Sequence, residues 1–105
     1  MMPTIPLRET AQQFVASTDV MLSLAQQDQW DDFLAAFEAR EAQMKVLVEE
    51  AGDALLSQLP DLQQDFSQAL EKNHQIEQLM RAKRDELAEA LSAVQQQRRL
   101  NMTYR

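Results

Sequence analysis

The sequence has no cysteine, a single glycine, three prolines and only 6% aromatic residues. Without cysteine, disulfide frameworks, thiolate zinc sites and cysteine nucleophiles are excluded together. Turn-forming residues are too few for a β-sandwich, a β-barrel or a glycine-rich phosphate loop. Apolar runs are also short: none reaches the roughly 18–20 residues that span a bilayer, and residues 1–8 hold no signal-peptide core. We therefore expect a cytoplasmic protein.

Acidic residues outnumber basic ones, 17 to 10, which gives a net charge of −7. Proteins that bind nucleic acid usually carry a basic surface, so nucleic acid is not the expected partner. The acidic excess is concentrated at residues 28–53, where eight acidic residues face Arg40 and Lys45, a net charge of −6. No acidic residue follows Glu89, while Arg98, Arg99 and Arg105 are basic. This basic end suits either a helix C-terminus or a docking role.

Apolar periodicity predicts three main helices, over about residues 5–26, 29–51 and 61–99, and a tail over 100–105. The break at Gln26–Gln29 is short, so the first two helices should be antiparallel, with Asp28 capping the second. A short extra helix is possible near 53–59. The predicted fold is one all-α domain over 1–105, an antiparallel up-down bundle. We expect its single core to contain Phe14, Met21, Phe33, Phe37, Phe66 and Leu70.

The third helical segment is longer than the bundle requires. Ten positions alternate in steps of three and four from Leu62 to Val94, and eight of them are apolar while two, Asn73 and Lys83, are polar. No glycine or proline interrupts the helix near His74. A helix over 61–99 is about 58 Å long, whereas each of the first two reaches about 33 Å. Part of the third helix therefore remains uncovered, and its apolar residues must meet a partner. This mismatch indicates an interaction protein.

Catalytic and metal sites find little support. Glu71 and His74 have the spacing used in di-iron bundles, but the chain has one histidine and such sites need a second pair. An all-helical enzyme of the chorismate mutase kind would need cations such as Arg8, Arg40 and Lys83 to converge on a dianion. Their spacing does not single them out, and the net charge opposes anion binding. We expect no enzyme activity, cofactor or metal.

Several segments together resemble one known family. The first helix ends in Leu22-Ser23-Leu24-Ala25-Gln26 and is followed at once by Gln29-Trp30-Asp31-Asp32-Phe33-Leu34. The block Asn73-His74-Gln75-Ile76-Glu77-Gln78-Leu79 leads into Arg84-Asp85-Glu86-Leu87. Over most of residues 10–95 this pattern resembles the flagellar type III export chaperones of the filament-cap protein (FliT-like).

The resemblance implies a cytoplasmic chaperone that binds the helical C-terminal segment of the filament-cap protein (FliD-like) and prevents its premature assembly. It also implies delivery to the export ATPase complex and, in some bacteria, binding to the master transcriptional regulator of flagellar genes. A homodimer is possible. The family's C-terminal segment can cover the binding surface, and we expect residues 95–105 to fold toward the acidic second helix.

The expected partner-binding residues combine the uncovered part of the third helix with a facing wall from the second. They are Phe37, Met44, Met80, Leu87, Leu91 and Val94. Two other functions remain open: a chaperone of the hook–filament junction proteins or another helical secretion adaptor, and a homo-oligomeric coiled-coil structural protein. Affinity capture of the partner separates the first, and a concentration-independent monomer mass excludes the second.

Overall fold

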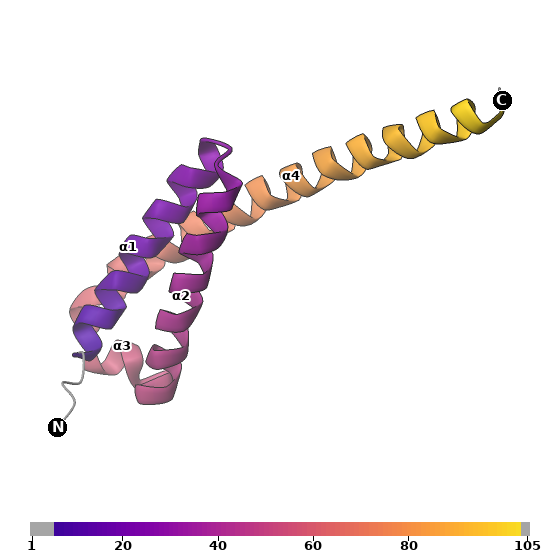
Figure 1. Cartoon of the computed structure of the whole chain (residues 1–105). Coiled ribbons are helices and arrows are strands. Elements are labelled where there is room, and N and C mark those ends of the chain that lie inside the picture. Colours follow the sequence, from indigo (N-terminus) through magenta and orange to yellow (C-terminus); the bar gives the residue numbers. More distant parts are fainter. Residues whose placement is uncertain (1–5, 104–105) are drawn as a thin grey trace.

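The computed structural model describes residues 6–103, and every regular element within them is helical (Figure 1). Helices α1 (Leu7–Gln26) and α2 (Trp30–Glu50) form an antiparallel pair. The 3₁₀ turn Gly52–Ala54, the short helix α3 (Leu55–Gln58) and the 3₁₀ turn Pro60–Leu62 then lead into α4 (Gln63–Thr103). The all-α prediction with a long C-terminal helix is confirmed. None of these helices is both long enough and apolar enough to cross a membrane.

The helix bounds differ from the predicted ones mainly at the end of α4. Instead of giving way to a tail at residue 100, the helix continues to Thr103. Residue 5 and residues 104–105 of the predicted segments lie outside the described residues. The chain passes through His74 without a break. Gly52 ends the second helix with a φ of 54°, a left-handed conformation that favours glycine.

The loop between α1 and α2 corrects the expected role of Asp28. Asp28 has a φ of 59°, which aspartate tolerates better than most residues, and Gln29 holds the N-cap position of α2 without a side-chain cap. The Asp28 carboxylate instead accepts a hydrogen bond from Nε1 of Trp30 and forms an ion pair with Lys83 of α4, 3.2 Å away. The loop is thereby tied to α4 rather than to its own helix.

The core consists of two apolar clusters, not the single one predicted. At the α3 end, Ala11, Leu47, Leu59 and Leu62 are buried, and Phe14 and Phe66 pack against them. At the loop end, Met21, Ala25, Phe33 and Ile76 are buried, and Phe37 packs against them. Leu70, predicted to lie in the core, is 72% exposed. It belongs to the part of α4 that faces α2 without touching it closely.

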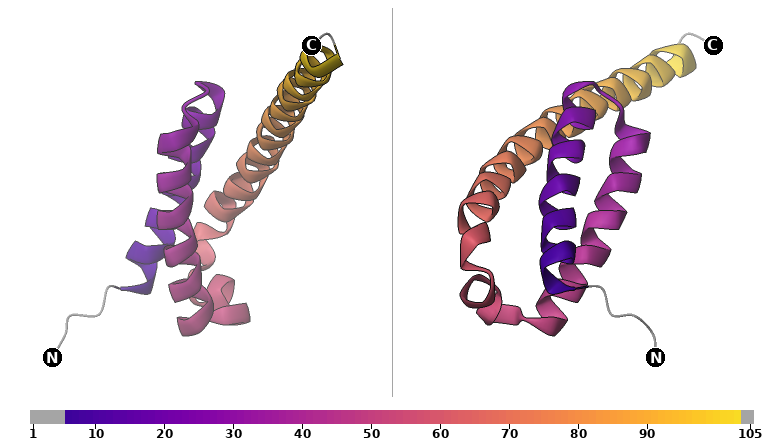
Figure 2. Two further views of the ribbon diagram at one scale, coloured as in Figure 1. Left: turned by 45° about the vertical axis from the view of Figure 1, so that its right-hand side comes forward. Right: turned by 90° about the vertical axis from the view of Figure 1, so that its left-hand side faces the viewer.

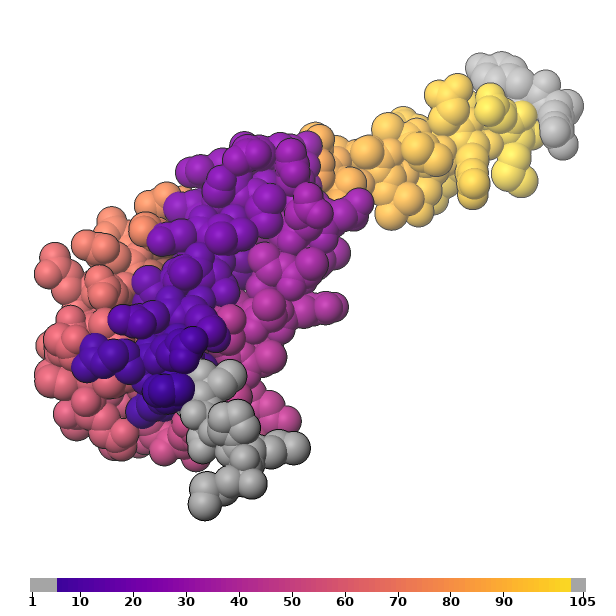
Figure 3. Space-filling view, turned by 60° about the vertical axis from the view of Figure 1, so that its left-hand side comes forward, coloured from indigo at the N-terminus to yellow at the C-terminus, as the bar shows by residue number. Residues whose placement is uncertain are grey.

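Beyond the bundle, α4 continues as a single helix (Figures 1 and 2). Lys83 is the last half-buried residue of α4, and every residue from 84 to 102 is exposed. The longest dimension of the molecule, 69 Å, is set by this helix, and the space-filling view shows the extension standing clear of the other helices (Figure 3). The expected folding of the tail toward α2 is therefore wrong for residues 95–103, because they continue the helix away from α2.

Candidate functional site

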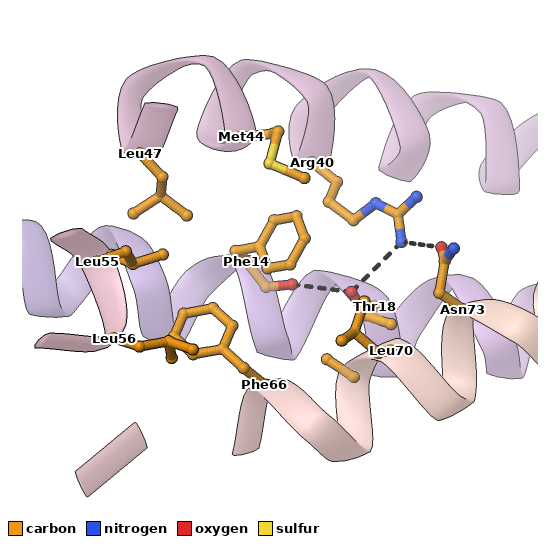
Figure 4. Close-up of a pocket in the computed structure, with 11 residues that line it drawn as sticks. Phe14, Thr18, Arg40, Met44, Leu47, Leu55, Leu56, Phe66, Leu70 and Asn73 are labelled. Carbon is orange, nitrogen blue, oxygen red and sulfur yellow. Dashed lines mark hydrogen bonds between the residues drawn. The ribbon is translucent and has the colours of Figure 1, made fainter. Parts of the chain in front are cut away.

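A groove lies between α2 and α4, with α1 as its floor (Figure 4). Helix α1 packs along both α2 and α4, but α2 and α4 make few direct contacts with each other. The space between them holds a cavity of about 290 Å³. We call it the α2–α4 groove; its lining residues are Phe14, Thr18, Arg40, Met44, Leu47, Leu55, Leu56, Phe66, Ala69, Leu70 and Asn73. Three helices around such a groove leave the position of a fourth helix open.

Most of the groove lining is apolar. The ring of Phe14, on the floor, lies 6.3 Å from that of Phe66, on the α4 wall, while α3 closes one end with Leu55 and Leu56. Met44 from α2 and Leu70 from α4 are 42% and 72% exposed and flank the opening. Apolar side chains at helical spacing on two facing helices are the pattern that receives an amphipathic helix.

A buried polar layer crosses the groove at its centre. The Nη1 of Arg40 on α2 donates to Oδ1 of Asn73 on α4 at 2.8 Å and to Oγ1 of Thr18 on α1 at 3.4 Å. The guanidinium carbon also lies 5.7 Å from the ring centre of Phe14 and 5.9 Å from that of Phe37. Burial lowers the pKa of Arg40, because removal from water disfavours its charged form. The layer separates the two apolar clusters.

An exposed apolar row continues from the groove along α4. Asn73, Met80, Leu87 and Val94 are seven residues apart, so they lie on nearly the same face of the helix. Met80 is 40% exposed, and Leu87, Leu91 and Val94 are each more than half exposed. Single exposed apolar residues are ordinary, but a row of them on one helix face indicates a binding surface.

The structure divides the six predicted partner-binding residues into three places. Phe37 is half-buried beside Phe33 in the loop-end cluster, and Met44 lines the α2–α4 groove. The row on α4 contains the others, namely Met80, Leu87, Leu91 and Val94. Because the α1–α2 loop meets α4 at Lys83, α2 does not reach the level of Leu87. Met44 therefore faces the groove, and the last turns of α4 have no facing wall.

Sequence reasoning missed the polar layer as a unit. Thr18, Arg40 and Asn73 each occupy an apolar position of their helix: Thr18 between Phe14 and Met21, Arg40 between Phe37 and Met44, and Asn73 between Ala69 and Ile76. Each residue was visible as a polar interruption. Thr18 and Arg40 fall near the middle of α1 and α2, and Asn73 falls near the middle of residues 63–83, the part of α4 that packs in the bundle. A comparison of these positions along the bundle would have revealed the layer.

The three cations considered for anion chemistry do not converge. Arg8 forms an ion pair with Asp61 near the α3 end, whereas Lys83 pairs with Asp28 at the opposite end of the bundle. Arg40 lies between them in the groove. These three residues therefore form no cationic cluster that could hold a dianion.

A family model described as flagellar protein FliT matches residues 8–105, nearly the whole chain. No curated protein and no solved structure matched the chain.

Proposed function

Because the chain belongs to the flagellar protein FliT family, whose members are export chaperones rather than enzymes, we propose that it binds the helical C-terminal segment of the filament-cap protein. The segment lies in the α2–α4 groove and continues along the apolar row of α4. Binding keeps the cap protein from assembling prematurely, and the complex is delivered in the cytoplasm to the export ATPase complex. Binding of the flagellar master regulator to the same surface would link export to gene expression.

The observation that carries this proposal is the largely apolar face of α4, which Asn73 and Lys83 interrupt. It begins inside the groove at Phe66 and Leu70 and runs through Met80 to Leu87, Leu91 and Val94 on the uncovered extension. A helix laid between α2 and α4 would complete a four-helix arrangement and cover this face. Of the six proposed partner-binding residues, Phe37 contributes indirectly, by packing beside the Arg40 guanidinium.

Isothermal titration calorimetry with a synthetic cap-protein C-terminal peptide tests the proposal. We expect binding with a negative heat-capacity change, because apolar surface is buried. A peptide with the same composition in scrambled order is the control and should not bind. No binding of the native peptide would contradict the proposal, and tighter binding of a junction-protein peptide would favour the alternative chaperone function.

A homo-oligomeric coiled coil is the second candidate, since a second copy could also cover the row on α4. Its distinguishing property is a mass that rises with protein concentration. Light scattering coupled to size-exclusion chromatography, with and without the cap-protein peptide, decides between them. For the chaperone we expect the peptide to bind whether or not the free protein dimerises.

A further inference from the structure

Arg40 is a buried cation that forms no ion pair with a described acidic residue, although a weaker electrostatic attraction from exposed Glu41 favours its charged form. Its side chain lies in the centre of the α2–α4 groove, and the residue is only 9% exposed. None of the ion pairs among the described residues includes it. Its Nε is buried and makes no hydrogen bond. Arginine is rarely buried in this way unless a carboxylate neutralises it.

The neighbours of Arg40 satisfy it only in part. Oγ1 of Thr18 and Oδ1 of Asn73 are neutral acceptors, and both take their hydrogen bond from the same nitrogen, Nη1. Two acids are near but turned outward. Glu41 follows Arg40 on α2 and is exposed, and exposed Glu77 accepts a hydrogen bond from the Asn73 amide at 3.3 Å. The guanidinium thus retains donor capacity that no described carboxylate uses directly.

The position of Arg40 in the groove determines what could supply the missing charge. Apolar side chains stand on either side of it, with Phe14 and Met44 among them, so an acid that reaches it must pass between apolar surfaces (Figure 4). A small free anion would gain no apolar contact there and would be repelled by a chain of net charge −7. A helix that carries an acidic side chain among apolar ones gains both the ion pair with Arg40 and the apolar contacts with the groove walls.

We propose that the helix bound in the α2–α4 groove carries one aspartate or glutamate among its apolar residues, and that this carboxylate pairs with Arg40. This inference rests on the proposed function and specifies the chemistry of the client. Apolar residues of the client three or four positions to either side would pack on Phe14, Met44, Phe66 and Leu70. The pair fixes the register of the client helix, because a shift by one turn leaves both charges buried and unpaired.

The test measures binding of the cap-protein C-terminal peptide by calorimetry, after each of its acidic residues has been changed singly to the matching amide. With the natural protein, we expect one of these peptides to bind about 30-fold more weakly or worse, the usual loss when a buried charge pair is broken. The other amide peptides should bind as the native peptide does. Equal binding of all of them would overturn the inference.

A double-mutant cycle assigns the effect to Arg40. In Arg40→Met the native peptide should no longer bind more tightly than the sensitive amide peptide, because its carboxylate has lost its charge partner. Arg40→Lys keeps the positive charge but not the planar guanidinium group. It should therefore retain part of the difference in affinity between the native and the sensitive amide peptide. Persistence of the full difference in Arg40→Met would place the partner cation elsewhere and contradict the inference.

The failures can be told apart. If the native peptide does not bind to the natural protein, the proposed function fails. If it binds and no amide substitution matters, only the pairing with Arg40 fails. Should Arg40→Met not fold, as circular dichroism would show, the peptide series with the natural protein still decides the question.

Discussion

Arg40 and Asn73 connect α2 to α4 by a hydrogen bond of 2.8 Å between Nη1 and Oδ1, across a groove whose two walls otherwise scarcely touch. Hydrogen bonds to charged groups contribute more than neutral ones, about 1.5–3 kcal/mol. This bond ties the two walls together at the centre of the groove.

Leu87→Asp should abolish binding of the cap-protein peptide while leaving the fold intact. Leu87 is 58% exposed, so the substitution should change the folding stability of the free protein little. A bound helix, however, would bury the new carboxylate without a partner, at a cost of several kcal/mol of binding free energy. Calorimetry measures binding, and circular dichroism measures helicity and melting temperature. Gln96→Asp is the matched control: at about 100° per residue it lies on the opposite face of α4 and should bind normally. Normal binding by Leu87→Asp would place the client elsewhere.

Ile76→Ala should destabilise the protein by about 2–5 kcal/mol, because Ile76 is almost completely buried and its truncation leaves a cavity. Leu70→Ala, on the same helix, should change stability by at most about 0.5 kcal/mol, because Leu70 is largely exposed. Urea unfolding followed by circular dichroism measures both. Comparable losses in the two variants would mean that α2 and α4 close over Leu70 in solution.

Acid should release the α1–α2 loop from α4 before it unfolds the bundle. Hydrogen bonds from Trp30 and Lys83 lower the pKa of Asp28, so the contact is complete above the unfolded-state value of about 3.9 and is lost as pH falls through the lower folded value. Trp30 is the only tryptophan, and its fluorescence reports on the contact directly. We expect an emission change with its midpoint below about pH 3.9.

The control for this titration is Asp28→Asn, which should lack the transition. On the alkaline side, the same ion pair raises the pKa of Lys83, so its contribution is complete below the ordinary lysine value and disappears as pH rises through the raised one. An identical acid transition in Asp28→Asn would assign the fluorescence change to another carboxyl group.

Removal of residues 88–105 should leave the bundle as stable as the full chain. Residues 88–102 are all exposed, so their removal takes no side chain out of the core. The urea midpoint should therefore be unchanged, whereas affinity for the cap-protein peptide should fall with the loss of Leu91 and Val94. A lower urea midpoint would show that the extension supports the bundle.

Helix periodicity was sufficient to predict the helical class and the long last helix, because three- and four-residue steps depend on backbone geometry alone. It could not predict which apolar residues of a helix become buried. Leu70 and Ile76 both fit the α4 pattern, yet only Ile76 is buried, because α1 packs closely on α4 and α2 does not. Which apolar residues become buried depends on the angles at which the helices cross, and these angles cannot be read from a local stretch of sequence.

Polar residues were the harder part of the site. Aspartate is a common helix-capping residue, so the sequence favours Asp28 as the cap of α2. The α1–α2 loop instead holds Asp28 in a left-handed backbone conformation, and its carboxylate contacts Trp30 and Lys83. In the sequence Arg40 is one of two cations in an acidic segment, and nothing near it indicates burial, because its buried position depends on Thr18 and Asn73, which are distant in sequence. A buried polar layer of this kind becomes predictable only when polar residues at apolar positions of different helices are compared at the same distance along the bundle.

The part of α4 that packs in the bundle acts as a ready nucleus for the part that does not. Forming the first turn is the costly step for a helix, and residues 63–83 have already provided it, so residues from 84 onward need only propagation. Their composition of alanine, leucine, glutamine, glutamate and arginine favours each added turn. An incoming segment thus meets a preorganised rod and spends little of its binding free energy on ordering α4.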